Sequence, residues 1–292
     1  MRLDSRQLAA FAAVLDEGSF EAAARALHVT PSAVSQRIKG LEERLGRVLV
    51  RRGTPCVATE AGEALQRHAR QLRLLEQEVL APFESAAAAP PVAIAVNADS
   101  IATWFLPALA ELRRAHALAF DLVVEDQDHS SALLRQGRVM AAVSADPLPV
   151  QGCRAVPLGR MRYRAVASPA FVAAHFAAGV DEHTLAAAPC TVYNRKDELQ
   201  HRWMRRVTRR RVAPVLHHVP STHGFIHAAL HGLGWGMNPD QLVAPLLASG
   251  ELVELVPDLV LDVRLYWQHW RLDAPLLAEL TRCVRHAAEA LR

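Results

Sequence analysis

Short polar and basic side chains between residues 30 and 40 have the chemistry needed to contact nucleic acid. Four of them share the helical face opposite the apolar Val34 and Ile38, namely Ser32, Ser35, Gln36 and Lys39, and Arg37 lies beside that face. Hydroxyl and amide groups hydrogen-bond to base edges, whereas cations and hydroxyls hold phosphates. The pattern predicts a helix that contacts DNA. An ordinary three-helix bundle with a solvated charged face fits the same pattern.

A second group of polar residues follows a short apolar run at residues 92–96, which is typical of a buried strand. Asn97, Asp99 and Ser100 lie within the next four positions. In open parallel sheets, ligands bind beyond the carboxyl ends of the strands, where helix N-termini direct their amide groups. The three residues are therefore candidates for ligand binding, and Ser100 with the amides near it can hold an α-carboxylate.

Three carboxylates follow the next apolar run, at residues 118–124. Glu125 is followed by Asp126 and Asp128, so the three acidic groups fall within four positions. Such a cluster can neutralise an ammonium or guanidinium group. The two aspartates are therefore candidate effector-binding residues. The alternative is that Ser100 and one aspartate only cap their helices while the other groups are solvated.

Catalytic and metal-binding motifs are not evident. His223, His227 and His231 recur every four residues, which can place imidazoles on one helical face, but no His-Glu-x-x-His motif accompanies them. The four cysteines form no Cys-x-x-Cys pair, and no Gly-x-Ser-x-Gly elbow is present. We therefore expect no metal, no cofactor and no enzymatic activity. Whether the histidines have a role is left open.

The positive charge of the chain is concentrated near its start. The formal net charge is +3, and residues 1–53 contain nine Arg or Lys against six Asp or Glu, a local surplus that equals that of the whole chain. This distribution is compatible with a polyanionic partner. Residues 202–211 contain six further arginines, which can touch bent DNA but are more typical of a solvated helix face.

Three predicted helices position the first group of polar residues. Apolar residues recur at helical spacing over residues 8–15 and 20–27, and Ser19 can cap the second helix. Thr30 can cap a third helix, which ends at Gly46. The tight turn between the second and third helices is the helix-turn-helix layout, in which the later helix enters the major groove.

A predicted hairpin and a long helix follow. Residues 49–59 alternate short apolar residues with a Gly and a Pro, which indicates a two-stranded wing with Arg51 and Arg52 at its base. Thr59 then caps a helix that runs to about Phe83. A lone helix of this length is marginally stable, so its apolar stripe predicts pairing with another copy of the chain. A dimer suits the twofold symmetry of operator half-sites.

The segment at residues 85–91 is small and uncharged and ends in two prolines, which predicts a domain boundary. Beyond it, apolar runs alternate with helical patterns in the order expected of a parallel sheet with helices on both faces. The fold class is therefore α/β. Further strand candidates are residues 163–167, 191–193, 215–219, 252–256 and 263–270.

Several motifs resemble those of the LysR-type transcriptional regulators. The most specific is SFEAAARALHVTPSAVSQRIKGLEERLG, followed by LVRR and TEAG. Within the family, the ArgP/LysG subgroup, which controls basic amino-acid export, has motifs similar to SAVSQRIKGLE, RRGTPCVAT, VNADSIATWF, EDQDHS and GLGWGM. The resemblance covers essentially the whole chain.

This resemblance implies three parts. They are a winged helix-turn-helix, a linker helix and a two-lobed, periplasmic-binding-protein-like effector domain, at residues 1–58, 59–84 and 92–292. The chain is expected to cross twice between the lobes. The first lobe then comprises residues 92–162 and 263–292, and the second comprises residues 163–262.

Residue roles are implied by the same resemblance. Ser32 and Gln36 fall where bases are contacted, and the residues near phosphates are Thr30, Ser35, Arg37 and Arg52. The cleft between the lobes holds the effector, lysine or arginine, to which the second lobe contributes Asn194 and Thr222. The implied partners are a double-stranded DNA operator, further copies of the chain in a homodimer or homotetramer, and RNA polymerase. The regulated gene is expected to encode an amino-acid exporter.

Two other interpretations fit parts of the sequence. One is an architectural DNA-binding protein with little ligand dependence, and the other is an α/β solute-binding protein or enzyme, which rests on fold analogy. The N-terminus lacks a charged start followed by an apolar run, and no stretch approaches the roughly 18–20 apolar residues that span a bilayer. We therefore expect a cytoplasmic protein without membrane contact, which counts against a solute-binding protein.

Overall fold

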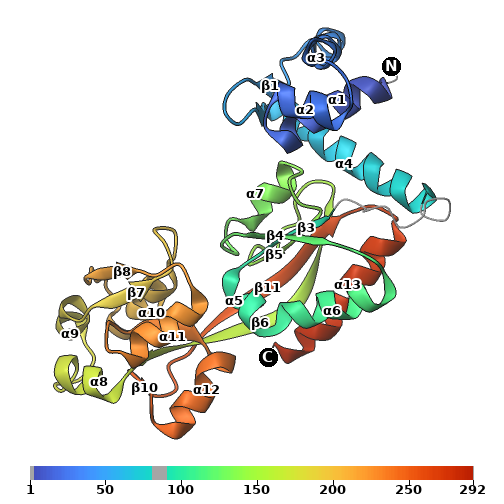
Figure 1. The fold of residues 1–292 in the computed structure, drawn as a ribbon. Coiled ribbons are helices and arrows are strands. Elements are labelled where there is room, and N and C mark those ends of the chain that lie inside the picture. The colour runs from blue at the N-terminus through green and yellow to red at the C-terminus, as the bar shows by residue number, and fades with distance from the viewer. Residues whose placement is uncertain (1–2, 81–90, 292) are drawn as a thin grey trace.

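The computed structural model describes residues 3–80 and 91–291, which form a small N-terminal unit, a long helix and a larger two-lobed unit (Figure 1). The first unit contains three helices, α1 (Ser5–Glu17), α2 (Phe20–Ala26) and α3 (Pro31–Leu45). Asp4, Ser19 and Thr30 cap their first turns through side-chain oxygens. The predicted second and third helices are confirmed. The first begins three residues before the apolar pattern does, because Asp4 caps it there.

These helices enclose a small apolar core that includes Phe11, Val34 and Ile38. The short strands β1 (Val50–Arg51) and β2 (Val57–Ala58) pair antiparallel, which confirms the predicted hairpin. The Thr59 hydroxyl accepts the amide of Gly62 at 3.1 Å and caps the next helix, as predicted. The apolar spacing and capping residues of this unit are therefore sufficient to give its local structure.

The long helix α4 (Glu60–Leu80) contacts both units of the molecule. Leu65 packs into the N-terminal core, so part of the stripe that we expected to pair with another copy is buried within this chain. Leu74 packs into the core of the larger unit, whereas Val79 is 67% exposed. The expected end of the helix near Phe83, and the predicted boundary except for Pro91, lie outside the described residues.

A seven-stranded sheet runs through the larger unit in the order β10-β6-β11-β5-β3-β4, with β9 also paired to β6. β3 is parallel to β4 and β5, which confirms the parallel order predicted from the first alternating runs, whereas β6 and β11 are antiparallel to their neighbours. The strands of this sheet are β3 (Val92–Val96), β4 (Phe120–Val124), β5 (Ala141–Ser144), β6 (Cys153–Ala167), β9 (Gly236–Pro239), β10 (Val253–Glu254) and β11 (Leu261–Trp270). A separate parallel pair is β7 (Cys190–Val192) and β8 (Leu216–His218).

Two long strands, β6 and β11, connect the lobes (Figure 1). β6 has 15 residues, and the predicted strand at 163–167 covers only its end, because Pro157 and Gly159 interrupt the pattern of its first part. All of β11 pairs with residues 153–163 of β6, with a register shift between Leu265 and Tyr266, and the last four residues of β6 pair with β9 and β10. The expected lobe limits at 162/163 and 262/263 fall inside these strands, so the chain passes between the lobes through continuous sheet.

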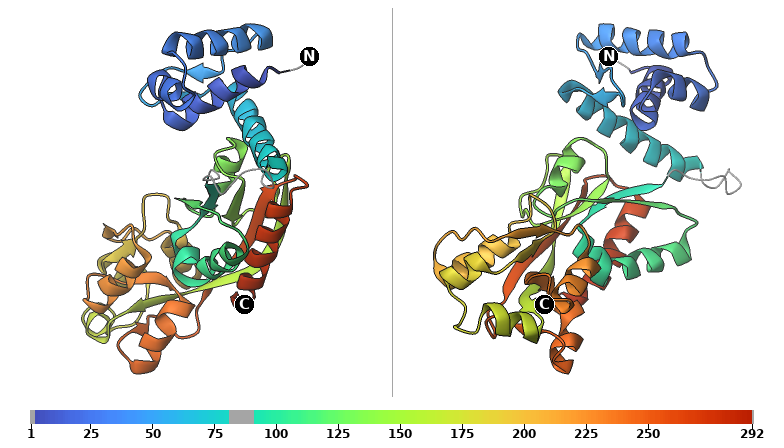
Figure 2. Two further views of the ribbon diagram at one scale, coloured as in Figure 1. Left: turned by 45° about the vertical axis from the view of Figure 1, so that its right-hand side comes forward. Right: turned by 60° about the vertical axis from the view of Figure 1, so that its left-hand side comes forward.

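Helices cover the sheet in both lobes (Figure 2). Those of the first lobe are α5 (Ala98–Ser100), α6 (Leu106–Ala115), α7 (Ser130–Arg135) and α13 (Pro275–Ala287), with a π-helical turn at Ile101–Phe105 and a final 3-10 turn at Ala288–Ala290. Those of the second lobe are α8 (Pro169–His175), α9 (Glu182–Ala187), α10 (Leu199–Thr208), α11 (Thr222–Leu230) and α12 (Asp240–Ser249). None of the helices in the described residues is long and apolar enough to cross a bilayer.

Candidate functional site

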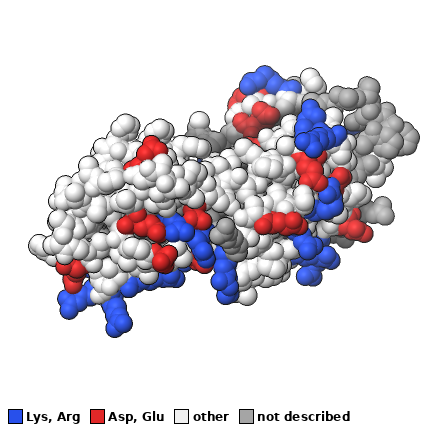
Figure 3. Space-filling model, turned by 90° about the horizontal axis from the view of Figure 1, so that it is seen from below, with Lys and Arg blue, Asp and Glu red and all other residues white. Residues whose placement is uncertain are grey.

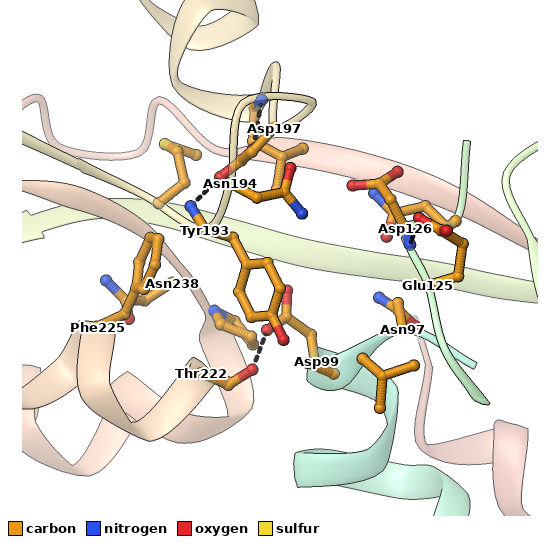
Figure 4. Close-up of a pocket in the computed structure, with 16 residues that line it drawn as sticks. Asn97, Asp99, Glu125, Asp126, Tyr193, Asn194, Asp197, Thr222, Phe225 and Asn238 are labelled. Carbon is orange, nitrogen blue, oxygen red and sulfur yellow. Dashed lines mark hydrogen bonds between the residues drawn. The ribbon is translucent and has the colours of Figure 1, made fainter. Parts of the chain in front are cut away.

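A cavity of about 230 Å³ lies between the two lobes, beyond the carboxyl ends of β3 and β4 (Figure 4). The first lobe lines it with Asn97, Ala98, Asp99, Val124, Glu125, Asp126 and Gln127. The second lobe lines it with Tyr193, Asn194, Asp197, Leu199, Thr222, Phe225, Met237, Asn238 and Pro239. This is the edge at which open α/β sheets bind ligands.

Asp99 is held by two hydroxyl groups. Thr222 donates to its Oδ1 at 2.7 Å (Figure 4), and Tyr163 donates to its Oδ2 at 2.8 Å. Thr222 begins α11 in the second lobe, so the first of these bonds crosses the cavity. Burial raises the pKa of Asp99, the two hydrogen bonds lower it in part, and the charge of Asp197 raises it again; the net pKa is raised.

Glu125 and Asp126 lie in another part of the wall, directly after β4. The Lys196 ammonium of the second lobe lies 3.1 Å from Glu125 Oε1, which joins the lobes a second time. Burial favours a higher pKa for Glu125, but hydrogen bonds from the Asp126 amide and from Lys196 outweigh it, so the pKa is lowered. Burial raises the pKa of Asp126, whose Oδ1 accepts the Asp128 amide at 2.8 Å. Glu125 thus already has a lysine partner, whereas the best-placed donor to Asp126 is a backbone amide.

A tight loop of the second lobe supplies the remaining carboxylate. Asp197 accepts the amides of Tyr193 at 2.9 Å and Leu199 at 3.0 Å, and Asn194 accepts the amide of Lys196 at 2.7 Å. These bonds fix the loop against the cavity. The charge of Asp197 raises the pKa values of both Asp99 and Asp126, so Asp197 repels each of them when the groups are ionised.

Two amide side chains in the wall have oxygens without a hydrogen-bond partner among the described residues. They are Asn97, which is 4% exposed, and Asn238, which is fully buried. A buried polar atom left unpaired costs about 1–3 kcal/mol, so a donor that reaches either oxygen is favoured. The wall also carries the carboxylates of Asp99, Glu125, Asp126 and Asp197. This acceptor-rich surface suits an ammonium or guanidinium group.

Five of the seven effector-binding residues predicted from the sequence line the cavity: Asn97, Asp99, Asp126, Asn194 and Thr222. Ser100 and Asp128 do not. Ser100 is fully buried inside the helical segment and caps no helix, and its hydroxyl has no partner among the described residues. The Asp128 side chain is exposed and lies outside the cavity lining.

Sequence reasoning did not identify Tyr193, Asp197 and Asn238 as site residues. Asn238 lies on β9, two residues after the glycine-rich segment at residues 232–236. Asp197 and Tyr193 belong to a loop whose shape depends on its own side-chain bonds to backbone amides. Tyr193 is the last residue of the predicted strand at residues 191–193, and this position at a strand end was the available signal for it. No comparable signal in the sequence indicates that the Tyr163 hydroxyl bonds to the distant Asp99.

The exposed face of α3 carries the predicted DNA-contacting side chains. Those that are exposed on this helix and on the wing are Ser32, Gln36, Lys39, Arg51 and Arg52. Ser35 and Arg37 are half-buried. Because Ser32 and Gln36 are four residues apart, they lie on the same side of the helix, one turn from each other. The helix therefore presents polar groups to solvent on one face while its apolar face closes the core.

Three contacts organise this surface. The Thr30 hydroxyl lies 3.0 Å from that of Ser32, in addition to capping α3. The Arg52 guanidinium lies 4.7 Å from the centre of the Phe20 ring, a cation–π distance, and donates to the Ser35 hydroxyl at 3.4 Å. The wing and α3 are thus joined, and their basic and hydroxyl groups form one surface.

The histidines of α11 lie on an exposed face of the second lobe. His223, His227 and His231 are all exposed, and the rings of the last two are 6.3 Å apart. Within the part of the chain that the structure describes, no group of three or more His, Cys, Asp or Glu side chains is arranged to hold a metal ion. Solvated side chains account for their positions.

The arginines on and after α10 lie on a surface of mixed charge. Arg205 lies 3.9 Å from Glu198, and Arg210 lies 3.1 Å from Glu182. Seen from below, Lys or Arg side chains and Asp or Glu side chains lie next to one another in several places on the molecule (Figure 3). A solvated helix face is therefore the better interpretation of the basic stretch.

Two family descriptions match the chain. Residues 5–63 match the bacterial regulatory helix-turn-helix proteins of the lysR family, and residues 85–292 match the LysR substrate binding domain. The transcriptional regulator LysG of Mycobacterium tuberculosis is 51% identical over an alignment of 292 positions, which covers 99% of this chain and 95% of the relative. The lysine export transcriptional regulatory protein LysG of Corynebacterium glutamicum is 44% identical over 292 residues, 98% of each protein.

Solved structures share the architecture. The crystal structure of ArgP from M. tuberculosis has 50% sequence identity and a TM-score of 0.90, with 99% of each chain covered. Full-length LysG from C. glutamicum with bound effector Arg has 42% identity and a TM-score of 0.81, covering 99% of this chain and 100% of that one. The match extends over the helix-turn-helix and both lobes, and the relatives are regulators rather than enzymes. The chain is therefore a DNA-binding transcription regulator of the LysR family.

Proposed function

We propose that this regulator responds to a basic amino acid, lysine or arginine, held in the cavity between the lobes. The observation that carries the proposal is the acceptor-rich wall, to which four acidic residues and two asparagines with unpaired side-chain oxygens contribute. A cation there gains charge-assisted hydrogen bonds and relieves the repulsion between the carboxylates. The relative from C. glutamicum, whose structure holds Arg, supports the same class of ligand.

The proposed ligand contacts come from both lobes. They are Asn97, Asp99, Asp126, Asn194 and Thr222, together with Asp197 and Asn238. Two contacts already cross the cavity, from Asp99 to Thr222 and from Glu125 to Lys196. A ligand amine that shares these carboxylates alters the balance between more open and more closed lobes. It does so only to the extent that it binds one arrangement more tightly than the other.

The proposed DNA interface is α3 with the wing. Ser32 and Gln36 contact base edges, and the side chains that hold phosphates or lie beside them are Thr30, Ser35, Arg37, Lys39, Arg51 and Arg52. The protein acts in the cytoplasm as a homodimer or homotetramer on a twofold operator, because a paired recognition helix matches paired half-sites. It controls an amino-acid exporter gene through contact with RNA polymerase. The name of the C. glutamicum relative, a lysine export regulator, supports this target.

Calorimetric titration of the full-length protein tests the effector. The ligands are lysine and arginine, with norleucine and citrulline as analogues that lack the side-chain charge. We expect saturable binding of at least one basic amino acid and binding of its neutral analogue that is weaker by about tenfold or more, since a hydrogen bond to a charged group contributes about 1.5–3 kcal/mol. If neither basic amino acid binds, the proposal is wrong, and an architectural DNA-binding role gains support.

A further inference from the structure

The side chain of Arg70, on α4, contacts both the N-terminal unit and the first lobe. Its Nη2 donates to Asp16 Oδ1 of α1 at 2.7 Å, and its Nη1 donates to the carbonyl oxygen of Gly137 at 2.5 Å. The side chains of Arg70 and Asp16 are 24% and 29% exposed, so the ion pair is partly shielded from solvent. One guanidinium group therefore connects the DNA-binding unit to the effector domain.

The backbone at Gly137 is shaped to receive the linker helix. Gly137 has a φ of +66°, and a Cβ atom placed there would lie 2.6 Å from the Cα of Arg67, too close for any side chain. Arg67 in turn donates to the carbonyl oxygen of Gln151 at 3.3 Å, and Leu74 is buried in the core of the larger unit. α4 and α7 lie next to each other in Figure 1 and in both views of Figure 2. The contact at Gly137 is thus close.

The other end of the α7 segment forms part of the effector cavity. Asp126 and Gln127, which line the cavity, precede α7, and Gly137 follows it. The carbonyl oxygen of Gln127 accepts the amide of Ala145 at 2.9 Å, and the Ser130 hydroxyl donates to the carbonyl oxygen of Val143 at 2.7 Å. These bonds attach the start of the segment to the end of β5. Residues 126–137 therefore form one short, well-braced connection between the cavity wall and the linker helix.

We propose that Arg70 is the residue through which the state of the cavity is transmitted to the DNA-binding unit. The inference rests on the proposed function and adds the path by which a change in the cavity reaches the DNA-binding unit. A ligand whose cation binds the Asp126 carboxylate changes the position of the α7 segment, and the Gly137 carbonyl moves with that segment. Arg70 then holds Asp16, and with it α1, in a different orientation. Because the guanidinium has two separate donor edges, it can keep both contacts at once, which a lysine ammonium on its flexible stem does less well.

A matched pair of variants tests this role. R70M removes both contacts and keeps an apolar stem, whereas R73M removes only a second ion pair with Asp16, at 3.2 Å, and leaves the Gly137 contact in place. For each protein, the affinity for DNA upstream of its own gene is measured with and without saturating arginine, and arginine affinity is measured by calorimetry. Coupling between two sites typically changes affinity by about 5- to 150-fold. We expect the ratio of DNA affinity with arginine to DNA affinity without arginine to fall to about one in R70M and to persist in R73M. The arginine affinity of both variants should change by less than about twofold.

Retention of the original ratio in R70M would overturn the inference. A second variant, Gly137→Ala, reaches the contact from the other side and is expected to lose the ratio too, because its Cβ separates the lobe from α4. If R70M fails to fold, which a thermal melt reports, this variant replaces it.

Hydrogen exchange separates this inference from the proposed function. If the unmodified protein binds neither lysine nor arginine, the proposed function fails, but the route can still be tested from the DNA side. Operator binding is then expected to change amide exchange over residues 130–137 in the unmodified protein and in R73M, and to leave it unchanged in R70M. An equal change of amide exchange in all three proteins would contradict transmission through Arg70.

Discussion

The carboxylates of the cavity differ in the partners that they already have. Asp99 accepts hydrogen bonds from two hydroxyl groups, and Glu125 forms an ion pair with Lys196. Both carboxylates therefore have most of their hydrogen-bonding capacity filled without a ligand. Asp126 accepts a hydrogen bond from a backbone amide, has the His129 Nδ1 atom 3.9 Å from its Oδ1, and has its pKa raised by burial. It therefore gains most from a cation. Asp99 and Asp197 add negative potential to the same space, whether or not they touch the ligand.

Asp126→Asn is expected to weaken arginine binding by roughly tenfold or more, because it removes a charge-assisted hydrogen bond of about 1.5–3 kcal/mol. Asp128→Asn is the matched control, since this neighbouring carboxylate is exposed and outside the cavity. Its arginine affinity should stay within about twofold of the original. Calorimetry measures the arginine affinity of both variants. An equal loss of affinity in the two would contradict a specific role for Asp126 and would show that only the local charge of the segment is important.

Arginine binding is expected to strengthen as the pH rises through the pKa values of Asp99 and Asp126. Burial raises both pKa values above those of exposed aspartates, so in the empty cavity these groups hold their protons to a higher pH. A bound cation favours the ionised carboxylates, so binding releases protons in this window, and the affinity levels off above it. Calorimetry in buffers of different ionisation enthalpy measures the released protons. An affinity that is constant from about pH 4 upward would contradict the assignment.

Single site residues were predictable where a polar group directly follows a strand. Asn97, Asp99 and Asp126 were found in this way, because parallel strands end at one edge of the sheet. Asp128 fits the same pattern, but strand ends do not determine which way each side chain in a turn points. Tyr163 could not be found, since its hydroxyl reaches Asp99 from a strand 64 positions away in the sequence.

Helix caps determine where the elements of the N-terminal unit begin. The Ser19 hydroxyl accepts the amide of Ala22 at 3.1 Å, and the next residue starts α2. Ser19→Ala is expected to lower the free energy of unfolding by about 1 kcal/mol, whereas Ser19→Asp, which keeps a capping oxygen, should retain most of the stability. Urea denaturation of both variants checks this. Equal stabilities for the two would show that the cap is unimportant here.

The α3 helix separates two kinds of DNA contact. Gln36→Ala is expected to change which bases are preferred at one position of each half-site, because the exposed amide can recognise a base edge. Arg37→Ala is expected to weaken binding to all sequences and to reduce the slope of log affinity against log salt by about one. Binding measurements over a salt series and a set of operator variants distinguish the two effects. An unchanged base preference in Gln36→Ala would remove that residue from the interface.

The elements themselves were predictable to different degrees. Helices α2 and α3 follow from an apolar period with clear caps, and both were predicted with their caps. β6 was predicted only over residues 163–167, because its first part carries arginines on the exposed face together with Pro157 and Gly159. Its pairing with β11, some hundred positions later, overrides these local preferences. Such long-range pairing leaves little signal in a short window of sequence.

At the scale of the whole molecule, the two functional surfaces are far apart in the chain but share connected elements. β6 and β11 join the lobes that enclose the cavity, and α4 joins the first lobe to the helix-turn-helix (Figure 1). The resemblance of the sequence motifs to one family implied this arrangement, and the full-length relatives confirm the fold. The docking of α4 on Gly137 was not predictable, because no local pattern marks a glycine as a contact for a distant helix.

Control of DNA binding by the cavity is tested most directly by measuring binding to the DNA upstream of the regulator's own gene, at fixed salt, with no ligand, lysine, arginine or citrulline. We expect specific binding whose affinity or footprint changes with lysine or arginine and does not change with citrulline at the same concentration. Specific binding that is identical under all four conditions would contradict the central claim that a cation in the cavity controls the DNA-binding unit.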